Sequence, residues 1–247
     1  MIGGILLLAV ILGASYFAYQ FTQPPHISIK WLGHSTFMIK SGDTIIYTDP
    51  AIMSPPKLDD YTNKADMILV SHIHSDHLNA TAIDKIRKES TVIIAPANCA
   101  SKIGGNIKSL KPGEKISVGS ITVEAVEAYN LRRFQSPGNP YHPKGLGVGY
   151  LLTIGDKTIY HAGDTDFIPE MNDLRSRNIY LALLPTGGTY TMDNPEAADA
   201  ALAINPRIVM SMHRWTTNPD EFKKAVEAKS SQIKVVLLQP GDVFEIE

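Results

Sequence analysis

SHIHSDH, residues 71–77, holds three of the 8 histidines of this 247-residue chain beside an aspartate. It follows ADMILV (65–70), an apolar run typical of a strand that is covered on both faces. Side chains in the loop after such a strand can converge on one point, and residues two apart in extended backbone project to the same side. Imidazole nitrogens and carboxylate oxygens are ligands that Zn²⁺ accepts. The stretch therefore predicts a metal site that includes His72, His74, Asp76 and His77.

Short β-branched segments on both sides of this stretch predict a layered architecture. Strands are expected at 27–32, 36–40, 44–49, 65–71, 91–96, 121–128, 147–154, 157–162, 179–185, 207–212 and 234–238. Helices are expected at 78–90, at 194–204 with Asn194 as N-cap and Pro195 in the first turn, and at 219–229. Strands and helices alternate too regularly for a helix bundle, and hairpins exclude an all-parallel sheet. The pattern predicts a layered α/β domain over 26–247.

Other polar residues stand at the ends of predicted strands, as the first cluster does. Asp164 follows the strand that contains KTIYHA, and His213 follows RIVMSM. His142 lies in a loop rich in proline and glycine between two strands. These three side chains are the candidates to complete the metal site.

The first residues of the chain have a different composition. Residues 2–21 carry no formal charge and, as a helix, would cover the ~30 Å hydrocarbon core of a bilayer. No basic residue precedes the run and no A-x-A site follows it, which argues against a cleaved signal peptide. We therefore expect a hydrophobic helix over 1–22 that anchors the protein in a membrane, or an uncleaved signal. Lys30 and Lys40 after the segment favour a cytoplasmic catalytic domain.

Composition excludes several classes of protein. The net charge is -2 and no long basic run occurs, so no nucleic-acid partner is expected. The single cysteine, Cys99, excludes an internal disulfide framework and a cysteine-rich metal site.

The motifs together resemble the metallo-β-lactamase superfamily, whose H-x-H-x-D-H signature is similar to residues 72–77, with GDT (163–165) and His213 similar to its later motifs. WLGHSTFMI (31–39), YTDP (47–50), YHAGDTDF (160–167) and PTGGTYTMDNPEAA (185–198) resemble a branch of metal-dependent hydrolases within it. That branch is related to ascorbate-6-phosphate lactonase and to the phospholipase D that cleaves N-acylphosphatidylethanolamine. The resemblance covers about 26–247 and implies a four-layered αββα sandwich.

The resemblance also implies two metal ions. One would be held by His72, His74 and a third histidine, the other by Asp76, His77 and His213, with Asp164 bridging. In many relatives the third histidine follows the strand at 121–128, where this chain has Asn130. His142 is the preferred candidate for that ligand, and His161 competes with it.

Two divalent ions about 3.5 to 4 Å apart can hold a bridging hydroxide that attacks an ester, lactone or phosphodiester. Zinc is the expected metal, with manganese or iron as alternatives. Asp76 would orient the nucleophile, His34 and His161 would transfer protons, and Asp49 would fix a ligand imidazole. Arg132, Arg133 and Lys144 lie in a loop that could bind an anionic group or could equally be an ordinary solvated loop.

The expected substrate is a small molecule or a lipid headgroup. Two other functions stay open at this point. Relatives on the same scaffold include di-iron oxidoreductases, although a ligand set with one bridging carboxylate favours zinc. The chain could also be a membrane-tethered binding protein without catalysis, but the ligand set looks complete.

Overall fold

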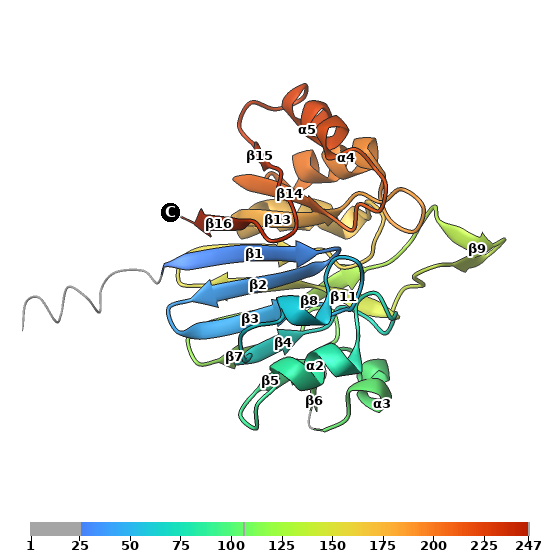
Figure 1. Ribbon diagram of the computed structural model, residues 1–247. Coiled ribbons are helices and arrows are strands. Elements are labelled where there is room, and N and C mark those ends of the chain that lie inside the picture. The colour runs from blue at the N-terminus through green and yellow to red at the C-terminus, as the bar shows by residue number, and fades with distance from the viewer. Residues whose placement is uncertain (1–25, 106, 247) are drawn as a thin grey trace, which may run out of the picture.

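The computed structural model describes residues 26–105 and 107–246, and these form two facing seven-stranded sheets with helices on their outer sides (Figure 1). In spatial order the first sheet contains β16 (Val243–Ile246), β1 (Ile27–Gly33), β2 (Thr36–Ser41), β3 (Thr44–Thr48), β4 (Met67–Leu69), β5 (Val92–Ile94) and β6 (Ile107–Lys108). The second contains β15 (Lys234–Val236), β14 (Ile208–Met212), β13 (Ile179–Pro185), β12 (Lys157–His161), β11 (Gly147–Ile154), β8 (Ile121–Ala128) and β7 (Lys115–Val118).

Each sheet has an antiparallel and a parallel part. β1, β2 and β3 form an antiparallel meander, and β3 to β6 run parallel. In the second sheet, β8, β11 and β12 are antiparallel neighbours, and β12 to β15 run parallel. Because neighbouring parallel strands end at the same edge of a sheet, the loops after β12, β13 and β14 leave the second sheet together.

The main core lies between the two sheets. Alternate residues of β1 and β8 are buried, as expected for strands with one face on a core. Ile29 and Phe37 of the first sheet belong to the same apolar cluster as Val123 and Leu151 of the second. Burying each such side chain contributes roughly 1.5–3 kcal/mol, and this makes the facing sheets a rigid frame for the loops at their ends.

Helices cover both outer faces, which gives the αββα order of layers. α2 (Ala80–Ile86) and α3 (Ala100–Ile103) pack on the first sheet, where Ile83 and Ile103 join a second apolar cluster with Ile68. α4 (Asn194–Ile204), α5 (Pro219–Glu227) and the 3₁₀ segment η3 (Pro169–Arg177) lie at the second sheet. Short 3₁₀ turns η1 (Leu58–Asp60) and η2 (Ala97–Cys99) and a hairpin of β9 (Phe134–Ser136) and β10 (Asn139–Pro140) complete the described elements. The hairpin projects beyond the sheets in Figure 1.

The predicted elements occur with shifted ends. The residue that caps α4 is Asp193, not Asn194, because the Asp193 carboxylate accepts the hydrogen bond from the Glu196 backbone amide at 2.9 Å. The helix predicted at 78–90 is shorter and begins after Asn79. β16, which pairs with β1, was not predicted from the sequence.

The expectation of membrane anchoring needs correction. No helix within 26–105 and 107–246 has the length and apolarity to cross a bilayer. The predicted hydrophobic helix over 1–22 lies outside the described residues. The described structure therefore gives no support to a membrane-anchored protein with a cytoplasmic catalytic domain.

Candidate metal centre

Loops from both sheets meet at one edge of the sandwich and carry the predicted ligands. The segment with His72, His74, Asp76 and His77 follows β4, and Asp164 and His213 follow β12 and β14. Backbone hydrogen bonds tie these loops together: the Val148 amide donates to the Ser71 carbonyl at 2.9 Å, and the His213 amide donates to the His34 carbonyl at 3.0 Å. The two sheets thus hold the loops in a fixed relation.

Glycine permits the closest of these approaches. A Cβ on Gly147 would lie 2.6 Å from the His72 Cβ and 2.9 Å from the Ser71 carbonyl oxygen. Any other residue at this position would push β11 away from the first ligand loop.

His72, His74 and His142 form the first group of candidate ligands. The His74 Nδ1 atom lies 3.1 Å from the His72 Nε2 atom and 3.1 Å from the His142 Nε2 atom. One nitrogen of each ring therefore points to a common point, as a tetrahedral metal ion requires. The structure thus brings His142, the preferred third histidine, beside His72 and His74, and its role as a ligand stays a prediction.

Asn130 sets the direction of the His142 ring. Its amide NH₂ donates to the Asp166 carboxylate at 3.1 Å and to the Tyr190 carbonyl at 3.0 Å, so its Oδ1 atom must face His142. That oxygen accepts the backbone N–H and the Nδ1–H of His142, both at 2.8 Å. The Nε2 atom of His142 therefore keeps its lone pair for the site. The sequence shows Asn130 where many relatives carry the third histidine, but it does not reveal that Asn130 orients His142.

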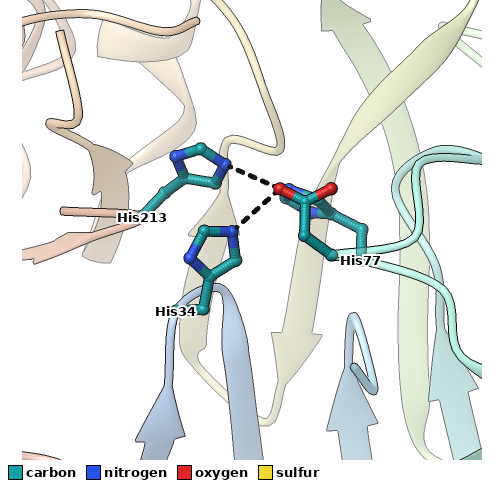
Figure 2. Close-up of side chains that lie close together, drawn as sticks. His34, His77 and His213 are labelled. Atoms are coloured by element: carbon teal, nitrogen blue, oxygen red, sulfur yellow. Dashed lines mark hydrogen bonds and ion pairs between the residues drawn. The ribbon is translucent and has the colours of Figure 1, made fainter. Parts of the chain in front are cut away.

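The second group contains Asp76, His77 and His213, together with His34. The Asp76 Oδ2 atom lies 3.1 Å from the Nε2 atom of His34, 3.4 Å from that of His213 and 3.8 Å from that of His77. Figure 2 shows His34 and His213 pointing to this carboxylate from two sides, with His77 behind it. His34, predicted as a proton-transfer residue, thus lies within reach of the same ion as the ligands.

Asp164 lies between the two groups. Its Oδ2 atom is 3.2 Å from His142 Nε2 in the first group and 3.1 Å from His213 Nε2 in the second. Its Oδ1 atom is 3.2 Å from His77 Nε2. This is the position that a bridging carboxylate would take.

Asp49 fixes the His77 imidazole, as expected. The His77 Nδ1–H group donates to Asp49 Oδ2 at 2.7 Å, while Asp49 also accepts the backbone N–H and the hydroxyl of Ser71 at 2.6 and 2.8 Å. With that proton held on Nδ1, the Nε2 atom of His77 faces the site and can offer its lone pair to a cation.

His161 is not brought to the site in the same way. Its Nε2 atom lies 3.1 Å from the Ser35 carbonyl oxygen and 3.7 Å from Asp49 Oδ2, and it belongs to none of the candidate ligand groups among the described residues. Burial lowers the pKa of its imidazole. Its contacts are those of a residue that supports Asp49.

The donor atoms fit a cation. The buried Nε2 atoms of His77 and His213 and the Oδ1 atom of Asp164 have no hydrogen-bond partner among the described residues. A buried polar atom without a partner costs about 1–3 kcal/mol, and several at one point are best explained by a bound ion. The set of imidazoles and carboxylates therefore suits a divalent metal.

Electrostatics hold the carboxylates ionised. Burial alone would raise the pKa of Asp164, but His213 and His77 keep it well below its usual range. Burial alone would also raise the pKa of Asp76, but the neighbouring His213 and His34 keep that pKa far below its usual value. Burial lowers the pKa of His34 to about 4 and holds the pKa of His72 well below its usual value. These two imidazoles are therefore neutral near pH 7.

Strained backbone marks the same region. His34, Asp49, His213 and Trp215 have φ values of 51°, 42°, 48° and 48°, in the left-handed region that costs such residues energy. Strain of this kind persists only where the surrounding structure enforces it, and it concentrates at functional sites.

A pocket of about 430 Å³ opens over the candidate ligands. Its lining includes His74, Asp76, His142 and Asp164 on the floor, with Tyr190 and Trp215 on the wall. These two rings are 37% and 49% exposed, so the mouth is apolar while the floor is charged. Tyr190 belongs to the GGTYT turn (187–191).

Two of the basic loop residues form ion pairs within the chain. Arg133 Nη1 donates to Asp166 at 2.7 Å and to Glu196 at 2.5 Å, and Lys144 pairs with Glu170 at 2.8 Å. These cations are engaged by carboxylates from other segments, and neither they nor Arg132 line the pocket over the metal ligands.

Comparisons with known proteins show which family this chain belongs to. A family model described as a beta-lactamase superfamily domain matches residues 28–213. A UPF0173 metal-dependent hydrolase of Thermococcus kodakarensis is 34% identical over 233 residues, which cover 89% of this chain and 100% of that protein. One of Staphylothermus marinus is 38% identical over 240 residues, covering 87% and 97%.

A solved structure is similar over nearly the whole domain. The crystal structure of a putative metal-dependent hydrolase from Parabacteroides distasonis is 36% identical, with a TM-score of 0.77, and the match covers 87% of this chain and 97% of that one. The chain therefore belongs to the metallo-β-lactamase superfamily, among its metal-dependent hydrolases.

Proposed function

We propose that this hydrolase uses two metal ions to cleave an ester, lactone or phosphodiester. His72, His74 and His142 would hold one ion, Asp76, His77 and His213 the other, and Asp164 would bridge. The observation that carries the proposal is the position of Asp164, with one carboxylate oxygen 3.2 Å from His142 and 3.1 Å from His213. A carboxylate shared by two imidazole groups is suited to two cations, and the predominance of imidazole favours zinc.

When bound, the ions would supply an activated water near neutral pH and neutralise negative charge that develops on the substrate. Side chains of the protein would orient the groups around the ions and exchange protons. Asp76 accepts a hydrogen bond from the His34 ring, which fixes the orientation of its carboxylate. His34 is neutral near pH 7 and holds a proton on Nε2, directed at Asp76, so it can exchange that proton as charge on the carboxylate changes.

The pocket favours a small substrate with an apolar part. Its volume of about 430 Å³ lies in the range of ordinary small-molecule sites. Tyr141 and Tyr190 pack edge to face at 4.8 Å on its wall and would contact such a part, while the scissile group faces Asp76 and Asp164. A small ester or lactone, or the phosphodiester headgroup of a lipid, meets these requirements.

Metal content is the first test. The chelator-treated protein would be loaded separately with zinc, manganese and iron, and metal would be measured by mass spectrometry. We expect about two ions per chain, and about one in His142→Ala. His26→Ala is the matched control, because the His26 side chain is 72% exposed and lies 3.4 Å from the Glu245 carboxylate, away from the candidate ligands.

Activity is the second test. Each loaded form would be assayed with a p-nitrophenyl ester, a γ-lactone and bis(p-nitrophenyl) phosphate. Hydrolysis of at least one by wild type and the His26 variant, lost in Asp164→Asn, supports the proposal. A single ion per chain that His142→Ala leaves in place would refute the two-metal arrangement.

A further inference from the structure

A second pocket, of about 370 Å³, adjoins the pocket over the metal ligands. Both pockets share Met53 and Trp215 in their linings, and His34 forms part of the wall of the second. Among the described residues that line the second pocket, Arg214 is the only one with a formal charge, and none carries a carboxylate. This pocket is therefore positive beside a metal centre.

Arg214 is held in place by its neighbours but is not neutralised by them. Its guanidinium carbon lies 4.1 Å from the centre of the Trp31 ring, and its Nη2 group donates to the Leu238 carbonyl at 2.8 Å. Arg214 is only 9% exposed, yet its Nη1 atom has no hydrogen-bond partner in the described part of the chain. Stacking on an indole fixes the plane of the guanidinium and leaves its edge for further hydrogen bonds.

Arg133 shows how this chain otherwise treats a largely buried arginine. Arg133 is paired with Asp166 and Glu196 at 2.7 and 2.5 Å. Within residues 26–105 and 107–246, no carboxylate lies within 4.0 Å of the Arg214 guanidinium. A buried charge without a counter-ion is costly, so its retention calls for a negative partner from outside the chain.

We propose that Arg214 binds an oxyanion, a carboxylate or a phosphate, that belongs to the substrate cleaved at the adjacent centre. That the oxyanion belongs to the substrate rests on the proposed function, whereas anion binding at Arg214 does not. The planar edge of a guanidinium matches both kinds of oxyanion through paired N–H donors. The substrate class would then be an ester, lactone or phosphodiester with a second, anionic group.

His34 relates this anion site to the reacting centre. The His34 Nε2 atom lies 3.1 Å from Asp76 Oδ2, and the centroid of the His34 ring is 5.0 Å from that of Trp215, which lines both pockets. The Trp31 indole N–H donates to the His34 carbonyl at 3.1 Å, so the ring on which Arg214 stacks also holds His34. His34 thus belongs to the wall of the Arg214 pocket and also contacts a carboxylate of the candidate metal centre.

Tryptophan fluorescence can test anion binding without metal or activity. The chain has 2 tryptophans, Trp31 and Trp215, and both line this pocket. Chelator-treated protein would be titrated with inorganic phosphate and, separately, acetate at constant ionic strength, with chloride as reference. We expect a saturable change in emission with at least one oxyanion, weakened about 10- to 100-fold in Arg214→Gln and less in Arg214→Lys.

Arg207→Gln is the matched control, because Arg207 stacks on the Tyr180 ring at 5.3 Å in a different pocket. Circular dichroism and metal content would verify that the Arg214 variants fold and retain the neighbouring His213 site. Equal titrations in wild type and Arg214→Gln, or no saturable change with either oxyanion, would overturn the proposal. The response to phosphate against acetate identifies the preferred oxyanion.

Kinetics then test the link to catalysis. Metal-loaded wild type and Arg214→Gln would be compared on p-nitrophenyl acetate and on the anionic ester mono-p-nitrophenyl succinate. We expect KM for the anionic ester to rise about 10- to 100-fold in the variant, with little change for the neutral ester. Equal effects on both esters would refute a role in substrate binding. Hydrolysis of neither, together with an intact fluorescence response, would count against the proposed function and leave the anion site standing.

Discussion

The Oδ1 atom of Asn130 accepts two hydrogen bonds from His142, one from the backbone N–H and one from the ring Nδ1–H, both at 2.8 Å. This pair of bonds decides which ring nitrogen faces His72 and His74. A loop residue 12 positions away in the sequence thereby becomes a candidate metal ligand with a defined tautomer.

Asn130→Ala should loosen the first metal position. Without the acceptor, the His142 ring can rotate and protonate on either nitrogen, so we expect metal affinity to fall about 10- to 100-fold. Competition with a chromogenic chelator would measure the change. Asn139→Ala, an exposed position in β10, is the control, and equal affinities in the two variants would contradict the orienting role.

Asp49→Asn should weaken metal binding at the second position, because it removes the acceptor for the His77 Nδ1–H group. An amide NH₂ facing the His77 Nδ1–H cannot accept its proton, so the ring would move that proton to Nε2 and lose its lone pair for the ion. We expect about 10- to 100-fold weaker binding of one ion, again by chelator competition. Asp43→Asn in the exposed turn between β2 and β3 is the control. Unchanged affinity in Asp49→Asn would show that His77 does not bind through Nε2.

The metal-free protein should lose stability as the pH rises above about 7. Burial lowers the pKa of His77, but Asp164 and Asp49 together raise it well above its usual value. Burial also lowers the pKa of His213, but the charge of Asp164 outweighs burial and raises that pKa. A histidine whose pKa is higher in the folded than in the unfolded chain stabilises the fold fully at pH values below the unfolded pKa of about 6.5. This stabilisation is lost as the pH rises through the folded-state pKa.

The imidazoles with lowered pKa values do not alter that window. His34, His72 and His74 are neutral above about pH 7 in both the folded and the unfolded chain, so they no longer affect the pH slope there. Thermal unfolding in chelator between pH 7 and 9 would measure the decline, which should be flatter in His77→Gln. A melting temperature that increases over this range would contradict the charge assignment.

Gly147→Ala should destabilise the fold and disturb the metal centre together. The new methyl group would lie 2.6 Å from the His72 Cβ, with backbone on the other side, so the ligand loop must move. We expect a loss of about 1–3 kcal/mol in the free energy of unfolding, with reduced metal content. Chemical denaturation and metal analysis of the same preparation would check both, and a variant with wild-type stability and metal content would show that β11 can shift freely.

Cys99 should be unreactive in the folded protein. It is fully buried against the first sheet, and burial raises the pKa of its thiol to about 12. The thiolate is the reactive form, so a disulfide reagent at pH 8 should label the chain only in denaturant. Rapid labelling of the native protein would mean that α3 and the η2 turn open readily.

The sequence alone carried the local part of this site. His72, His74, Asp76 and His77 are neighbours along the chain, and the strand before them is recognisable from its apolar composition, so their convergence follows from local geometry. The αββα order of layers was also predictable, because strand and helix periodicities are local properties and the motifs resemble a known superfamily. The ends of α2 and the cap of α4 shifted because competing hydrogen bonds decide them.

Only the tertiary structure decided how distant residues meet. His142 lies 68 residues from His74, so its approach to that ring depends on the fold, which turns His161 towards the Ser35 carbonyl instead. Charge pairing likewise depends on the fold. Arg133 could have bound an anion but is paired with Asp166 and Glu196. Arg214, which no sequence pattern singled out, is buried and has no carboxylate partner among the described residues. Distances across the chain depend on packing of the two sheets, and pairing of charges depends on those distances.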